Sequence, residues 1–156
     1  MSEYTALAGR IRTSLQDVKN SVDRSLQLSD KAHKSGDDGY WDGVALNLHG
    51  FYTGVEHIFE DIARTLENSV PSGPEWHMDL LTQMASEIEN VRPAVISHET
   101  RTCMDEYRGL RHVVRNVYAF NLRSARLHEL TLNLEACFSR VQKELLALAE
   151  FLESVD

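Results

Sequence analysis

The residues from Arg101 to Arg126 carry the chemistry that stands out in this chain. Six of the twelve arginines fall in this window, with no lysine and only Asp105 and Glu106 as acids. The window is therefore net positive by about four, although the whole chain has a formal charge of −8. An arginine guanidinium offers a fixed fork of donors that suits phosphate, and it stays charged near pH 7. The window predicts a local site for a phosphate-bearing ligand.

Helical spacing divides this window into an apolar face and a polar face. The apolar face holds Leu110, Val113, Val114, Val117 and Phe120. The polar face holds Arg108, Arg111, His112, Arg115 and Asn116, and Tyr118 returns to the side of Arg111. A solvated helix face usually mixes lysine with glutamate. An arginine stripe with histidine and asparagine therefore indicates a functional face.

The polar face has the side chains needed to hold and cleave a phosphodiester. Arg111 and Arg115 are donors for phosphate, His112 titrates near neutral pH, and Tyr118 adds a phenol. A metal-free ribonuclease needs cations on the scissile phosphate and a base that helps the 2′-hydroxyl to attack. The alternative is a basic face that pairs with acidic helices of the same bundle or of a second protomer. The pattern alone leaves both interpretations open.

A second polar group comes earlier, where Glu56 and Glu60 lie one turn apart beside His49 and His57. The ordinary interpretation is a solvated stripe, or ion pairs with arginines of a neighbouring helix. The functional alternative is that Glu56 supports the site by orienting an arginine of the motif helix within a shared cleft.

Metal and acyl-transfer chemistry lack the spacings they require. The sequence has no Glu-x-x-His pair, no zinc-ligand spacing among its cysteines and histidines, no glycine-rich phosphate loop and no nucleophile elbow. We therefore expect no metal and no cofactor. Cys103 and Cys137 lack a CxxC spacing and lie in apolar-patterned helices, so they are predicted to be two reduced core thiols.

Apolar residues recur every three or four positions in four long segments and one short segment. The predicted helices cover about 4–30, 42–66, 75–89 and 98–121, with a last helix from about 124 to 152. A polar run at 35–39, a linker with two prolines at 68–74 and a break at 91–97 separate them. The pattern predicts an all-α, antiparallel up-and-down bundle of four long helices and one short helix. Its length fits a single domain over residues 1–156.

Several features bear on partners and location. Apolar residues off the main stripes are compatible with a second buried surface, and so with a homodimer: Leu28, Leu46, Tyr52, Leu132, Leu146 and Phe151. No window reaches the roughly 18 uncharged apolar residues that span a bilayer, and the first residues lack the apolar core of a signal peptide. We expect a cytoplasmic protein without a membrane partner. Its net charge argues against general nucleic-acid affinity, so an anionic ligand would be drawn in by the arginine window.

The arginine window resembles the signature of HEPN domains, specifically the HepT-like group of bacterial toxin–antitoxin systems. That signature has an arginine, a polar residue, three further positions, a histidine, one position and a tyrosine. Here it reads Arg111-His112-Val-Val-Arg-Asn116-Val-Tyr118. Three other runs are similar to a HepT-like subgroup: Tyr52-Thr-Gly-Val-Glu56-His-Ile-Phe-Glu60-Asp-Ile-Ala, Arg92-Pro93-Ala-Val-Ile-Ser and Asp105-Glu106-Tyr107-Arg108. The resemblance covers most of residues 44–122.

The resemblance implies a helical bundle that dimerises, so that two motif helices form one cleft. It implies metal-independent RNA cleavage by active members, restrained by a nucleotidyltransferase antitoxin encoded alongside. In some members this partner modifies the motif tyrosine with nucleotide. By position, Arg111 matches the motif arginine, His112 the polar residue and Tyr118 the tyrosine, which makes Tyr118 the candidate modification site.

Asn116 occupies the position of the motif histidine and departs from the family pattern. An amide neither takes nor gives a proton at neutral pH, so Asn116 could hold a phosphate or ribose but could not be the general base. His112 would then supply the titrating group from about 5 Å away, one turn back. Three functions stay open: a toxin ribonuclease, a non-cutting RNA- or nucleotide-binding subunit of a nucleotidyltransferase pair, and a structural dimeric bundle.

Overall fold

The described residues of the computed structural model are 2–116 and 124–156, and for 111–116 only the backbone is described. They form α1 (Glu3–Ser35), α2 (Tyr40–Ile62), a π-helical turn η1 (Ala63–Glu67), α3 (Trp76–Met84), α4 (His98–Asn116) and α5 (Ser124–Ser154). Within these ranges the only β pairing is an isolated bridge between Ile88 and Arg92. The predicted all-α bundle of four long helices and one short helix is confirmed.

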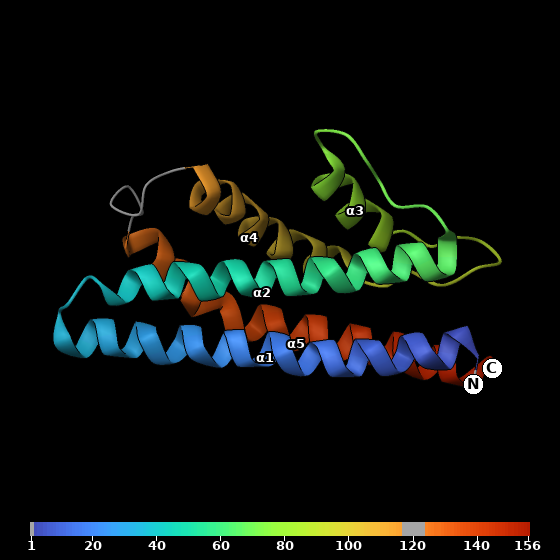
Figure 1. The fold of residues 1–156 in the computed structure, drawn as a ribbon, viewed down its shortest axis with the longest axis horizontal. Helices are drawn as coiled ribbons and strands as arrows, with labels where there is room; N and C mark the ends of the chain where they lie inside the picture. The colour runs from blue at the N-terminus through green and yellow to red at the C-terminus, as the bar shows by residue number, and fades with distance from the viewer. Residues whose placement is uncertain (1, 117–123) are drawn as a thin grey trace.

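The helices form a long layer with two helices laid over one side of it. α1, α2 and α5 run side by side along the long axis, and α3 and α4 lie over α2 (Figure 1). Both chain termini lie at the same end of the long layer (Figure 1). The polar run at 35–39 makes the turn from α1 to α2, where Gly36 takes the left-handed conformation with φ 72° and donates to Ala32 O. The predicted break there is confirmed.

One apolar core draws side chains from every α-helix, including Leu15, Val55, Leu81, Met104 and Leu145. Glycine lets α1 and α2 approach closely, because a Cβ on Gly54 would lie 2.8 Å from Val18 Cγ2. Two of the residues assigned to a second surface, Leu28 and Tyr52, are instead buried in this core. Leu46 is exposed, as is Leu132.

The short helix α3 ends five residues earlier than predicted, at Met84 rather than at Glu89. The guanidinium of Arg92 donates hydrogen bonds to the carbonyl oxygens of Gln83 and Ser86, at 3.0 and 2.8 Å. The carbonyl of Met84 accepts from the N–H groups of the returning chain at residues 95 and 96. These carbonyls are therefore satisfied by the loop, and the helix does not continue. Measured by length and hydropathy, none of the helices described above qualifies as a membrane span.

Candidate functional site

The predicted site residues lie mostly at the C-terminal end of α4. Its backbone is helical through Asn116, so the motif positions 111, 112, 115 and 116 lie on a helix as predicted. The side chains of Arg111, His112, Arg115 and Asn116, and the whole of Tyr118, lie outside the described residues. Their mutual contacts stay predictions. The described surroundings of the site are the side chains of α4 up to residue 110 and the elements packed against them.

Arg108 is the one arginine of the predicted stripe whose side chain is described. Its Nε donates to Asp105 Oδ1 at 2.6 Å, one turn back on α4, and 28% of its side-chain surface is exposed. This hydrogen bond is the main cause that raises the pKa of Arg108, and partial burial opposes it. Smaller contributions in the raising direction come from Asp105 again, from Tyr52 on α2 and from Glu75 just before α3. Arg108 therefore lies within electrostatic reach of α2 and of the residue that precedes α3.

Glu56 is buried, and the expectation that it belongs to a solvated stripe is wrong. It is 3% exposed, and its Oε2 accepts from Tyr52 Oη at 2.9 Å. The same oxygen lies 2.5 Å from His77 Nδ1. The helical arc of α2 that carries Glu56 faces α3 and the core, which explains the burial. Among the described residues its ionic partner is therefore a histidine of α3, and no arginine of α4 bonds to it.

His77 is a functional candidate that the sequence pattern did not reveal. It lies in the first turn of α3, and 17% of its side chain is exposed. The ring of Trp76 lies against it, with centroids 3.6 Å apart and planes inclined by 34°. No spacing in the sequence marks His77. Its partner Glu56 is 21 residues away, and the two meet only because of the direction in which the chain returns after the 68–74 linker.

A buried ion pair anchors α3 and thereby positions His77. Arg92 Nε and Nη2 donate to the two carboxylate oxygens of Glu67, both at 2.9 Å. The two side chains are 0% and 4% exposed. Gln83 at the end of α3 also donates to Glu67, at 2.7 Å. Such a bidentate pair with its remaining donors on backbone carbonyls is the arrangement in which a buried ion pair is tolerated.

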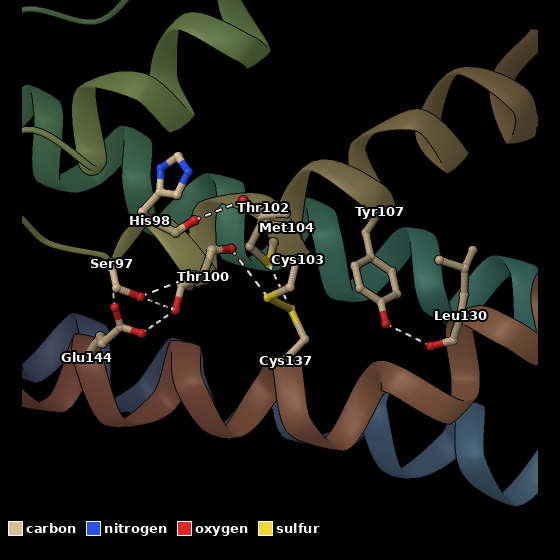
Figure 2. The surroundings of a disulfide bond; sticks show 10 residues. All are labelled: Ser97, His98, Thr100, Thr102, Cys103, Met104, Tyr107, Leu130, Cys137 and Glu144. Atoms are coloured by element: carbon tan, nitrogen blue, oxygen red, sulfur yellow. Dashed lines mark hydrogen bonds between the residues drawn. A yellow bond between two sulfur atoms is a disulfide. The ribbon is translucent and has the colours of Figure 1, made fainter.

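The expectation of two reduced thiols is wrong, because a disulfide joins Cys103 on α4 to Cys137 on α5, with Cα atoms 5.9 Å apart (Figure 2). The physical reason is the antiparallel pairing of the two helices. Thr100 bonds to Glu144 and Tyr107 bonds to Leu130 on either side of the two cysteines, so residue numbers rise along α4 as they fall along α5. The pairing places them opposite each other.

Further contacts fix α4 on α5 along the same seam. Tyr107 Oη donates to Leu130 O at 2.7 Å (Figure 2). Near the N-terminus of α4, Thr100 Oγ1 donates to Glu144 of α5 (Figure 2). Burial is the main cause that raises the pKa of Tyr107, so its phenol stays a donor. A hollow of about 390 Å³ lies beside the disulfide and is lined in part by His98, Glu106 and Arg140.

No cluster of three or more histidine, cysteine, aspartate or glutamate side chains in the described part of the chain could hold a metal ion.

The fold and site define an all-α helical bundle whose fourth helix carries an arginine-rich motif. The chain belongs to the HepT-like family, because the family model described as HepT-like protein matches residues 43–152, from α2 to α5. This match confirms the resemblance to HEPN domains of the HepT-like group. No curated protein sequence and no solved structure matches the chain.

Proposed function

We propose that this chain is the RNA-cleaving toxin of a toxin–antitoxin pair and acts as a metal-independent endoribonuclease. The observation that carries the proposal is the motif from Arg111 to Tyr118, which begins on α4 inside the region that matches the HepT-like family. Arg111 grips the scissile phosphate, and Arg108 and Arg115 extend the basic track on either side. His112 supplies an acid or base from the same helix.

The proposed site is completed by a second copy of the chain. In a cytoplasmic homodimer, the α4 helices of two protomers face each other across a cleft that holds single-stranded RNA. Asn116 holds phosphate or ribose there, and Tyr118 stacks on a base or receives a nucleotide from a nucleotidyltransferase antitoxin. The arginine-rich stretch supports this arrangement, since phosphate recognition in an acidic chain needs a local concentration of positive charge.

Asn116 favours a second candidate, in which the protein binds RNA or nucleotide without cutting it. An amide in the position of the motif histidine retains hydrogen bonding but loses proton transfer. Such a protein would be the binding subunit of a nucleotidyltransferase pair. The two candidates use the same surface and differ only in the chemical step.

The test is incubation of the purified chain with single-stranded RNA in EDTA. The matched set is wild type, Arg111→Ala, His112→Ala and a control, Arg10→Ala, which removes a surface arginine of α1 paired with Asp61. Cleavage that is lost in the first two variants and kept in the control supports the ribonuclease. Binding without cleavage, weakened steeply by salt and by Arg111→Ala, supports the second candidate. No affinity for RNA or nucleotide at low salt contradicts both and leaves a structural bundle.

A further inference from the structure

A buried carboxylate–imidazole pair lies beside the motif helix and was no part of the predicted site. Its members are Glu56 on α2 and His77 on α3, joined at 2.5 Å. We propose that His77 is the general base of RNA cleavage and that Glu56 is the residue that positions it. This inference rests on the proposed ribonuclease function. It fills the chemical gap left by Asn116, whose amide cannot take a proton.

The carboxylate fixes which nitrogen of the ring is available. A buried carboxylate needs donors to offset its lost hydration, and Glu56 Oε2 receives both Tyr52 Oη and His77 Nδ1. A carboxylate only accepts hydrogen bonds, so Nδ1 carries a hydrogen and the lone pair of the neutral ring is on Nε2. This is the orientation that a carboxylate behind an imidazole imposes in acid–base catalysis.

The imidazole of His77 is fixed by its bond to Glu56 and is still partly exposed to solvent. Its side chain is 17% exposed. Within the part of the chain that the structure describes, the bond to Glu56 is the only hydrogen bond to the ring. Nε2 is therefore free to exchange a proton with a ligand.

The surroundings of His77 match the chemistry of a nucleotide. Half-buried Trp76 provides an aromatic plane beside it, and unpaired RNA bases stack on such planes. Arg108, 28% exposed, provides a phosphate donor on α4. Tyr52 links the two groups, since it bonds to Glu56 and lies within electrostatic reach of Arg108. Trp76 for a base and Arg108 for a phosphate therefore accompany His77 on this side of the bundle.

The proposed step conserves atoms and charge. His77 Nε2 takes the proton of a ribose 2′-hydroxyl, and the 2′-oxygen forms a bond to the adjacent phosphorus. The bond from phosphorus to the 5′-oxygen of the next nucleotide breaks, and that oxygen takes a proton from the imidazolium of His112, the acid of the proposed function, which then regains a proton from solvent. The products are a 2′,3′-cyclic phosphate and a 5′-hydroxyl, and no water, metal or redox partner is consumed. The imidazolium of His77 returns its proton to solvent for the next turnover.

The test compares metal-free cleavage of a single-stranded RNA by the full chain and three variants. His77→Gln removes the base but keeps a donor for Glu56, and Glu56→Gln removes only the charge behind the ring. His57→Gln is the matched control, since His57 is an exposed histidine on the same helix as Glu56. We expect His77→Gln to lose at least about 100-fold in rate, in line with general-base catalysis. Glu56→Gln should lower kcat while leaving the KM for RNA close to the wild-type value, because the ring is then held less firmly, and the control should match wild type.

Two further measurements separate a catalytic role from a structural one. Thermal unfolding and affinity for a 2′-deoxy oligonucleotide show whether each variant is folded and binds. His77→Ala with added imidazole tests whether a diffusible base restores the rate, which a structural role would not allow. Partial recovery supports the proposal.

Each failure has a distinct signature. Wild-type cleavage together with an unchanged rate in His77→Gln overturns the role of His77 and leaves the ribonuclease standing. Wild-type binding without cleavage overturns that role as well, while keeping RNA binding. Neither cleavage nor binding by wild type overturns the proposed function itself, and the role of His77 with it. If His77→Gln does not fold, an unchanged kcat in Glu56→Gln overturns the inference.

Discussion

The two sides of α2 are held by different forces. Toward α1 the contact is apolar and close, with Gly54 seated against Val18. Toward α3 and α4 the contact includes buried charge, with Glu56 bonded to His77 and Glu67 bonded to Arg92 close to the end of the same helix. The fit of side chains by size therefore determines the packing of α2 against α1. Hydrogen bonds and buried charge determine its packing against α3 and α4.

This difference shows where function is concentrated. Apolar packing tolerates many sequences of similar volume, whereas a buried ion pair is costly and fixes particular partners in particular places. The polar side is also the side that bears the motif helix. We interpret the charged contacts there as the framework that sets α3 and α4 in position for chemistry, and the apolar side as the support behind them.

The largest effect should come from breaking the buried ion pair with Arg92→Leu. The change leaves Glu67 as an unpaired buried charge and removes the donors to two carbonyls of the α3 terminus, Gln83 and Ser86. We expect the free energy of unfolding to fall by about 3–5 kcal/mol. Urea denaturation followed by circular dichroism measures it.

A matched control for that change is Arg10→Leu on the other side of α2. Arg10 pairs with Asp61 at 2.8 Å, but the side chains are 48% and 27% exposed. Solvent screens such a pair, so its loss should cost less than about 1 kcal/mol. Equal losses at the two sites would contradict the distinction between the sides. The double variant Arg92→Leu with Glu67→Leu should recover part of the stability, because no charge is then left unpaired.

Reduction of the disulfide should have the next largest effect. Cys103 and Cys137 are 34 residues apart, and opening a loop of that length costs about 2–4 kcal/mol of stability through the freedom of the unfolded chain. Unfolding with and without dithiothreitol measures the cost. The double variant Cys103→Ala with Cys137→Ala should not respond to the reductant. A wild-type protein that is equally stable in both conditions would show that the crosslink contributes nothing.

The apolar side can be tested with Gly54→Ala. The new Cβ would lie 2.8 Å from Val18 Cγ2, and the branched side chain of Val18 has little freedom to move away. Overpacking should outweigh the better helical preference of alanine and leave a loss of about 1–2 kcal/mol. Gly9→Ala is the control on α1, where a Cβ meets nothing within 4 Å and should stabilise the helix. Val18→Ala should rescue Gly54→Ala, and a failure to do so would place the cost elsewhere.

The apolar side was largely predictable from sequence, and the polar side was not. Periodicity gives the long helices, because burial of one stripe repeats with the helical turn. Gly36 marks the turn between α1 and α2 because only a residue that tolerates a positive φ ends a helix in that way.

The contact between Glu56 and His77 had no such signal. It depends on the direction in which the chain returns after the 68–74 linker, and no local preference of those residues fixes that direction. The same is true of Arg92, which sequence analysis placed in a simple break between helices. Its guanidinium donates hydrogen bonds to carbonyl oxygens near the end of α3. In a longer helix these carbonyls would accept from backbone N–H groups. Long-range polar contacts of this kind decide the position of the site, and periodicity does not record them.

The smallest effect should be the pH dependence of the surface pair on the apolar side. The hydrogen bond from Arg10 is the main cause that lowers the pKa of Asp61 in the folded protein. A lowered carboxyl pKa contributes stability that is present above the unfolded value of about 3.9 and is lost as pH falls through the folded value. The stability difference between wild type and Asp61→Asn should therefore be flat from neutral pH down to about 5 and shrink below about 4.

That difference should stay under about 1 kcal/mol even at neutral pH, because the pair is partly exposed. Urea denaturation at several pH values measures it, and a repeat in about 1 M salt should reduce it further by screening. The buried pair of Arg92 and Glu67, whose side chains are 0% and 4% exposed, should keep its contribution in the same salt. A surface pair as insensitive to salt as the buried one would mean that exposure does not separate the two sides of α2, and that the contrast between them lies in packing alone.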